Sequence, residues 1–179
     1  MKTSASYLLA ATLLLALGNT LLGSGTVQAQ STRAPAGKAA GKAAGKSCVT
    51  ISGTISGTVT SAPGASQTTI LGTVAGSLEG SVHATVTSLE PQPDGTIRLK
   101  LSHDFVTDEG FLLQTTDTAK LTPVPGLKNV YQQSTEYKVT GGTGRFAEAK
   151  GTFTNHGETD LGRGLLTLRY DGRVCGVAR

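Results

Sequence analysis

The stretch that decides the fold is residues 48–59, CVTISGTISGTV, in which apolar residues and glycine alternate with serine and threonine. A period of two is typical of a β-strand with one buried and one solvated face, because successive side chains point to opposite sides. Glycine- and proline-rich breaks then separate further runs of the same kind. These runs cover residues 70–86, 97–105, 111–121, 131–139, 153–161 and 166–174.

The alternation predicts an all-β domain of seven or eight antiparallel strands. The number depends on residues 68–89, which form either one long bent strand or two strands joined between Gly76 and Gly80. Short breaks between consecutive runs indicate hairpins, and closing the sheet would remove its exposed edges. We therefore expect an antiparallel up-and-down β-barrel. The 24 glycines among 179 residues argue against a helical bundle.

The first 29 residues have the pattern of a secretory signal peptide. Lys2 precedes an apolar run at residues 8–17, and Val27 and Ala29 offer the small residues of a cleavage site before Gln30. The apolar run is shorter than the roughly 20 residues of a membrane span. We expect a secreted or periplasmic protein without stable membrane insertion.

Residues 30–47 are a Gly/Ala/Lys low-complexity linker, and residues 48–179 form the predicted barrel domain. The net charge of +4 reflects the amino-terminal part, since all 12 acidic residues and 11 of the 16 basic residues lie in 48–179. The barrel domain therefore lacks the basic excess of a nucleic-acid-binding protein, and no nucleic-acid partner is expected.

The two cysteines, Cys48 and Cys175, test the closure of the sheet. Cys48 begins the first predicted strand and Cys175 ends the last. In a closed antiparallel barrel with an even number of strands these positions lie side by side, and both side chains point outward by parity. With export making disulfides accessible, we predict a Cys48–Cys175 disulfide rather than two unrelated thiols.

By the same parity, nearly all aromatic side chains of the barrel point inward. Inward glycines, among them Gly53, Gly57 and Gly172, remove side-chain volume from that interior. The interior is therefore either a hollow pocket or a packed core in which glycine permits bends of the barrel. The candidate ligand-binding residues are Phe105, Phe111, Tyr131, Gln133, Tyr137, Asn155 and Tyr170.

No catalytic motif stands out, but His103 and Asp117 point inward and could form an acid–base pair if their strands align. The alternative is that His103 is a structural core residue whose hydrogen bonds are made within the protein. His83 and His156 face outward, so no metal site is expected, and no cofactor is expected either.

Residues 142–147, GTGRFA, also fit a dinucleotide-binding pattern. That pattern must open a helix, and Gly151 would end any helix after about one turn. We interpret the glycines as a tight turn, with Phe146 tucked under the end of the barrel.

The longer segment 139–151, VTGGTGRFAEAKG, resembles the Gly-Gly-Thr-Gly-x-Phe…Ala-x-Gly signature of the allene oxide cyclase and dirigent β-barrels. The resemblance implies an eight-stranded, calycin-like barrel with an apolar cavity, and it implies a trimer. Plant members cyclise a fatty-acid epoxide or steer the radical coupling of phenols. Their catalytic residues cannot be carried over, because no local motif here matches them.

Three functions remain open from the sequence. The first, which we favour, is an exported module that binds a small hydrophobic or phenolic molecule without established catalysis. The second is a cyclase or isomerase that uses His103 or Asp117 on a small apolar substrate. The third is a structural or surface-contact protein, suggested by the outward Ser/Thr rows at residues 50–58 and at Thr152 and Thr154.

Overall fold

The computed structural model describes residues 47–60 and 67–178. Almost all of them lie in one antiparallel sheet, which confirms the all-β prediction. The strands are β1 (Ser47–Thr60), β2 (Thr69–Gly76), β3 (Gly80–Pro91), β4 (Ile97–Thr107), β5 (Leu112–Pro123), β6 (Val130–Gly142), β7 (Lys150–Asp160) and β8 (Leu165–Val177). A short 3-10 helix, η1 (Gly144–Phe146), connects β6 to β7.

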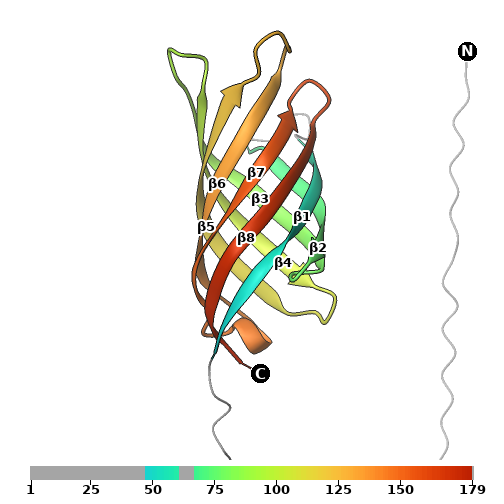
Figure 1. Ribbon diagram of the computed structural model, residues 1–179, viewed down its shortest axis with the longest axis vertical. Helices are drawn as coiled ribbons and strands as arrows, with labels where there is room; N and C mark the ends of the chain where they lie inside the picture. Colours follow the sequence, from blue (N-terminus) through green and yellow to red (C-terminus); the bar gives the residue numbers. More distant parts are fainter. Residues whose placement is uncertain (1–46, 61–66, 179) are drawn as a thin grey trace, which may run out of the picture. The chain divides into compact units, whose positions relative to one another are not determined.

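The sheet closes into an up-and-down barrel in the order β1 to β8 (Figure 1). Each strand pairs with its neighbour in sequence, and β8 pairs back onto β1. Residues 68–89 form two strands rather than one. Gly76 and Gly80 adopt φ values of 106° and 144°, which residues with a Cβ rarely adopt. The two glycines therefore allow the chain to reverse between them.

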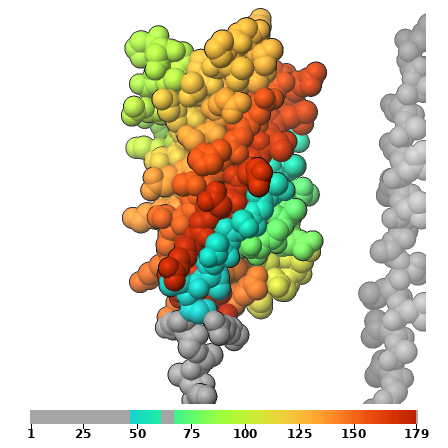
Figure 2. Space-filling model, viewed as in Figure 1, coloured from blue at the N-terminus to red at the C-terminus, as the bar shows by residue number. Residues whose placement is uncertain are grey.

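The seam between β1 and β8 carries the predicted disulfide. Cys48 and Cys175 are joined by an S–S bond of 2.03 Å, across 127 residues of sequence. Cys48 is exposed and Cys175 is half-buried, in agreement with side chains on the outer side of the sheet. In Figure 2 the two strands run side by side over this face of the molecule.

The buried core lies inside the barrel and follows the predicted parity. Along β5, Leu113, Ala119 and Leu121 are buried, and Gln114 and Lys120 between them are exposed. Each large apolar side chain that is fully buried contributes about 1.5–3 kcal/mol relative to an exposed one. The alternating sequence is therefore what selects this register and this inner face.

One end of the barrel is closed by side chains. Phe146 of η1, Leu78 of the β2–β3 turn and Val177 at the end of β8 are all buried there, which confirms the expected position of Phe146. The Arg145 guanidinium lies 4.8 Å from the centre of the Phe146 ring and 3.5 Å from the Glu109 carboxylate. The β3–β4, β5–β6 and β7–β8 connections lie at the opposite end (Figure 1). A small cavity lies there beside the exposed side chains of Leu89 and Leu161, and we call this end the open end.

The predicted signal peptide, residues 1–29, and nearly all of the linker lie outside the described residues. Ser47, the last residue of that linker, is already the first residue of β1. In the described part of the chain, no helix has the length and apolar character needed to cross a bilayer.

Candidate functional site

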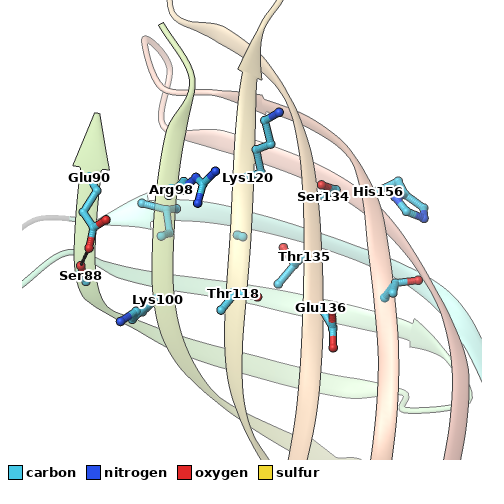
Figure 3. Close-up of a pocket in the computed structure, with 13 residues that line it drawn as sticks. Ser88, Glu90, Arg98, Lys100, Thr118, Lys120, Ser134, Thr135, Glu136 and His156 are labelled. Carbon is cyan, nitrogen blue, oxygen red and sulfur yellow. Dashed lines mark hydrogen bonds between the residues drawn. The ribbon is translucent and has the colours of Figure 1, made fainter. Parts of the chain in front are cut away.

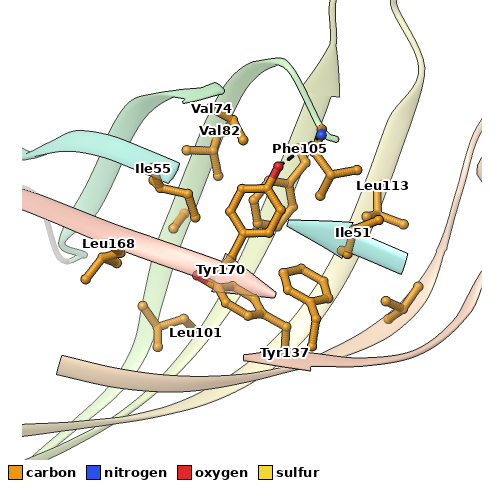
Figure 4. Close-up of a cluster of buried hydrophobic side chains, with 14 of the residues drawn as sticks. Ile51, Ile55, Val74, Val82, Leu101, Phe105, Leu113, Tyr137, Leu168 and Tyr170 are labelled. Atoms are coloured by element: carbon orange, nitrogen blue, oxygen red, sulfur yellow. Dashed lines mark hydrogen bonds between the residues drawn. The ribbon is translucent and has the colours of Figure 1, made fainter. Parts of the chain in front are cut away.

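An aromatic cluster fills the middle of the lumen (Figure 4). The rings of Tyr137 and Phe153 stack at 4.3 Å between centroids, and Phe105 meets both of them edge-on at 5.7 and 5.8 Å. Tyr170 extends the cluster, with its ring 6.2 Å from Phe153. Edge-on and stacked pairs of this kind add to the stability that their burial provides. This part of the interior is a packed core.

The predicted ligand-binding residues therefore separate into groups. Phe105, Tyr137, Asn155 and Tyr170 are at most 1% exposed and belong to this core. Phe111 is half-buried at the closed end, where its ring lies against Gly144. Tyr131 is half-buried near the start of β6.

Around Gly53, Gly57 and Gly172 the inward glycines leave no hollow, so this part of the interior agrees with the packed-core alternative. A Cβ on Gly53 would lie 2.6 Å from the Tyr170 hydroxyl oxygen, and a Cβ on Gly172 would lie 2.5 Å from Cβ of Phe153. A Cβ on Gly57 would lie 3.0 Å from the carbonyl oxygen of Leu71. Aromatic rings and neighbouring backbone already use the space that these glycines leave free.

A buried polar network borders the aromatic cluster. His103 Nδ1 lies 2.6 Å from Asp117 Oδ2, and because a carboxylate only accepts, Nδ1–H is the donor. Both side chains are buried. His103 stacks on Phe105 at 5.7 Å and meets Tyr137 edge-on at 5.0 Å. The structure thus brings together the predicted acid–base pair, deep inside the barrel.

Tyr137 and Asn155 extend this network across the lumen. The Asn155 amide donates to the Tyr137 hydroxyl, and Tyr137 lies directly opposite Asp117 in the β5–β6 register. Burial, and then the negative charge of Asp117, raise the pKa of Tyr137 well above that of a free tyrosine. Tyr137 therefore remains a neutral phenol at physiological pH.

Three buried oxygens in this region have no hydrogen-bond partner within the described residues. They are Thr115 Oγ1, Asp117 Oδ1 and Asn155 Oδ1. Unpartnered buried polar atoms destabilise a fold. The network can therefore accept hydrogen bonds beyond those it already makes.

A second polar chain leads from the core toward the open end. Thr159 Oγ1 donates to Gln133 Oε1 at 2.6 Å, and Gln133 Nε2 donates to Thr135 Oγ1 at 3.0 Å. All three side chains are buried. One hydrogen of the Gln133 amide nitrogen is used by Thr135, which leaves the second for another acceptor.

Above this chain lies a small apolar cavity of about 50 Å³ at the open end, which we call the mouth. Leu89 and Leu161 form part of its rim and are 54% and 40% exposed. Gln133 and Thr159 are polar residues at its base. The lining residues are Val59, Thr68, Ile70, Val86, Leu89, Ile97, Leu99, Leu121, Gln133, Thr159, Leu161 and Leu166.

Of the predicted ligand-binding residues, Gln133 is therefore the one that lines the mouth. The leucines and isoleucines of the mouth are not singled out by the sequence, because inward parity alone does not show which inward positions lie near an end of the barrel. The distance of each residue from the nearest turn was the available signal.

His83 and His156 are exposed, as parity predicted. Within residues 47–60 and 67–178, no three His, Cys, Asp or Glu side chains gather so as to hold a metal ion.

A larger hollow, of about 660 Å³, lies on the outer face of the sheet across β3 to β7 (Figure 3). Its charged residues include Arg98, Lys100 and Lys120. The sequence did not predict this groove, because outward residues of alternating strands look like ordinary solvated surface.

No protein-family model, curated protein or solved structure matches this chain.

Proposed function

We propose that the barrel binds a small hydrophobic or phenolic molecule through its mouth. The observation that carries this proposal is an apolar cavity at the open end with buried polar groups at its base. Small-molecule sites have this composition, with apolar walls and a few placed polar groups that fix orientation. Gln133 and Thr159 supply these polar groups at the base of the mouth.

The size of the mouth limits how the ligand binds. A cavity of about 50 Å³ is well below the roughly 300–1,000 Å³ of sites that enclose a drug-sized molecule. The mouth therefore takes one end of the ligand, such as a ring or alkyl terminus. Because only part of the ligand is buried, we expect a Kd on the order of micromolar or weaker.

A phenol suits the base of the mouth. The free N–H of the Gln133 amide can donate to a phenolic oxygen, because Thr135 uses the other hydrogen of that nitrogen. The walls around it, including Leu121 and Leu166, are apolar and would contact the ring.

The test is titration of the full chain with the fluorescent probe 1-anilinonaphthalene-8-sulfonate. We expect saturable fluorescence that a simple phenol displaces. Leu89→Glu should weaken probe binding at least tenfold, because it places a carboxylate at the rim. Leu71→Glu is the matched control, since Leu71 is 52% exposed on β2 and does not line the mouth. Absence of saturable binding, or equal loss in both variants, would contradict the proposal.

The short contact between His103 and Asp117 supports a second candidate function. A buried acid–base pair 2.6 Å apart is the arrangement that a cyclase or isomerase acting on an apolar substrate would use. The pair lies below the mouth and does not line it, so a substrate must displace core side chains to reach it. The test is the NMR signal of the His103 ring during the titration. An unchanged signal at saturation would exclude this function for the probe and for ligands of its size.

We further propose that the chain is exported and is a distant member of the allene oxide cyclase and dirigent barrels. The closed eight-stranded barrel and the segment 139–151 support the family, and the Cys48–Cys175 bridge supports an oxidising compartment. Amino-terminal sequencing of the exported protein should find Gln30 first. Sedimentation would test the trimer that the resemblance implies.

A further inference from the structure

The groove on the outer face of the sheet is lined by polar and charged side chains (Figure 3). Its volume of about 660 Å³ is within the range of small-molecule sites. It is distinct from the mouth: among the described residues, Leu99 is the one that lines both. Hydroxyl groups line its middle, from Thr118 on β5, Ser134 on β6 and Thr154 on β7.

Two cations face each other across neighbouring strands at one side of the groove. Arg98 on β4 lies directly opposite Lys120 on β5, and Lys100 lies two residues further along β4, opposite Thr118. Like charges directly opposite each other in a sheet destabilise it. Within the described residues, Arg98, Lys100 and Lys120 have no carboxylate within the 4.0 Å that defines an ion pair.

The acid that could neutralise Arg98 is directed elsewhere. Glu90 on β3 is the register partner of Arg98, but its Oε1 accepts a hydrogen bond of 3.1 Å from Ser88 Oγ on its own strand. Figure 3 shows Glu90 turned along β3 toward Ser88. The Arg98 and Lys120 charges therefore remain available to a ligand.

Asp94, in the β3–β4 turn, is a further acid in reach of Lys120. Hydrogen bonds from the Thr96 hydroxyl and N–H, and to a smaller extent the charge of Lys120, lower the pKa of Asp94. Its Oδ1 is held by both Thr96 groups, at 2.7 and 3.0 Å. Asp94 therefore caps its own turn and does not form an ion pair with Lys120.

We propose that this outer groove binds a polyhydroxylated carboxylic acid, the chemistry of a sugar acid. The carboxylate lies between Arg98, Lys100 and Lys120, where it relieves the repulsion between facing cations. The hydroxyls lie along the floor of the groove and bind Thr118, Ser134 and Thr154.

Glu136 and His156 line the far side of the groove. They are better suited to bind hydroxyl groups of the ligand than a second carboxylate. A carboxylate accepts hydrogen bonds from sugar hydroxyls, and an imidazole both donates and accepts. A ligand with a negative charge at each end would meet Glu136 and be disfavoured. The groove therefore selects an acid with one charged end and one hydroxylated end.

The test is an NMR titration of the ¹⁵N-labelled full chain, with the disulfide intact, at constant ionic strength. The two probes are D-glucuronate and acetate, which carry the same charge. We expect saturable shifts on β4 and β5 with D-glucuronate, and binding of acetate at least fivefold weaker. No saturable shifts with D-glucuronate, or equal affinity for the two acids, would overturn the proposal.

The variant Arg98→Gln/Lys120→Gln should weaken D-glucuronate binding at least tenfold. The matched control is Lys138→Gln/Lys150→Gln, which removes the same charge from exposed positions outside the groove. An equal loss in the control would show only general charge attraction and would overturn the assignment.

Ser88→Ala gives a second test that leaves the net charge unchanged. Without the Ser88 hydroxyl, Glu90 is free to turn to its register partner Arg98 and compete with the ligand. We expect binding of D-glucuronate to weaken severalfold. Unchanged affinity would contradict the role assigned to Arg98.

Discussion

The hydroxyl oxygen of Tyr170 lies 3.0 Å from the backbone nitrogen of Leu78 and accepts its hydrogen, although 92 residues separate the two in sequence. The same hydroxyl donates to the carbonyl oxygen of Ala75 at 3.3 Å. The Tyr170 ring reaches this turn by passing over Gly53. The last strand is thereby joined to the β2–β3 turn from inside the barrel.

Gly53→Ala should lower the free energy of unfolding by about 3 kcal/mol or more. Its Cβ would lie 1.9 Å from the Ala75 carbonyl oxygen and 2.6 Å from the Tyr170 hydroxyl oxygen, and backbone cannot move aside as a flexible side chain can. Urea unfolding measures the change. Gly126→Ala is the control: its Cβ has no atom within 4 Å, but φ is +82°, so we expect a loss of about 1 kcal/mol. Similar losses in both variants would contradict the packing argument.

Replacing both cysteines by alanine should destabilise the barrel by about 2–5 kcal/mol. The bridge closes a loop with a sequence separation of 127 residues, and a loop of this length gives about 5 kcal/mol in the chain-entropy model. Guanidinium unfolding of the double variant, compared with the oxidised wild type, measures the effect. An unchanged midpoint would show that the β1–β8 seam holds without the bridge.

His103→Phe should destabilise the protein by about 3–5 kcal/mol, because it leaves the buried Asp117 carboxylate without its 2.6 Å partner. Adding Asp117→Asn removes that charge. The double variant His103→Phe/Asp117→Asn should therefore be more stable than His103→Phe alone, by at least about 1 kcal/mol. A double-mutant cycle in urea measures the coupling, and strictly additive losses would refute the hydrogen bond between the two buried side chains.

Alkaline pH should destabilise the barrel through Tyr137. Its pKa is raised in the folded state, mainly by burial, so above pH 10 the unfolded chain loses the proton and the folded chain keeps it. The stabilisation is complete below pH 10 and falls by about 1.4 kcal/mol per pH unit above it. Burial also raises the pKa of Tyr170, which adds to the decline.

The measurement is urea unfolding between pH 9 and pH 11. Tyr137→Phe should reduce the slope by about one proton relative to wild type, whereas Tyr131→Phe, at a half-buried ring, serves as the control. Both cysteines of the chain are in the disulfide, so no free thiol promotes exchange at this pH. Equal slopes in the two variants would contradict the buried phenol.

Parity was enough to predict the inner face, because a period of two assigns every residue to one face. The barrel and the Cys48–Cys175 bridge also required the short breaks between strands and the closure that they imply. Parity does not decide whether inward glycines leave space. The close approach of Tyr170 to Gly53 depends on the register of β1 against β8, in which the two residues are direct partners. That register is set when the sheet closes.

The sequence did not specify the register across the β4–β5 hairpin, on which the His103–Asp117 pair and the Arg98–Lys120 pair both depend. His103 and Asp117 were known to point inward, but their contact depends on the alignment of β4 with β5. Arg98 and Lys120 face each other because they lie equally far from Glu109 in the β4–β5 turn. Residues 108–110, Asp-Glu-Gly, carry a turn signal in the sequence. Counting outward from that turn reveals the pair of facing cations.

The start of β1 and the end of β8 both lie at the closed end of the barrel, fastened together by the disulfide. Both leave the domain on the side away from the mouth. A fusion partner or surface attached directly before Ser47 or directly after Ala178 would therefore contact the barrel at its closed end. Protein immobilised through either of these positions should keep its mouth accessible to the surrounding solution.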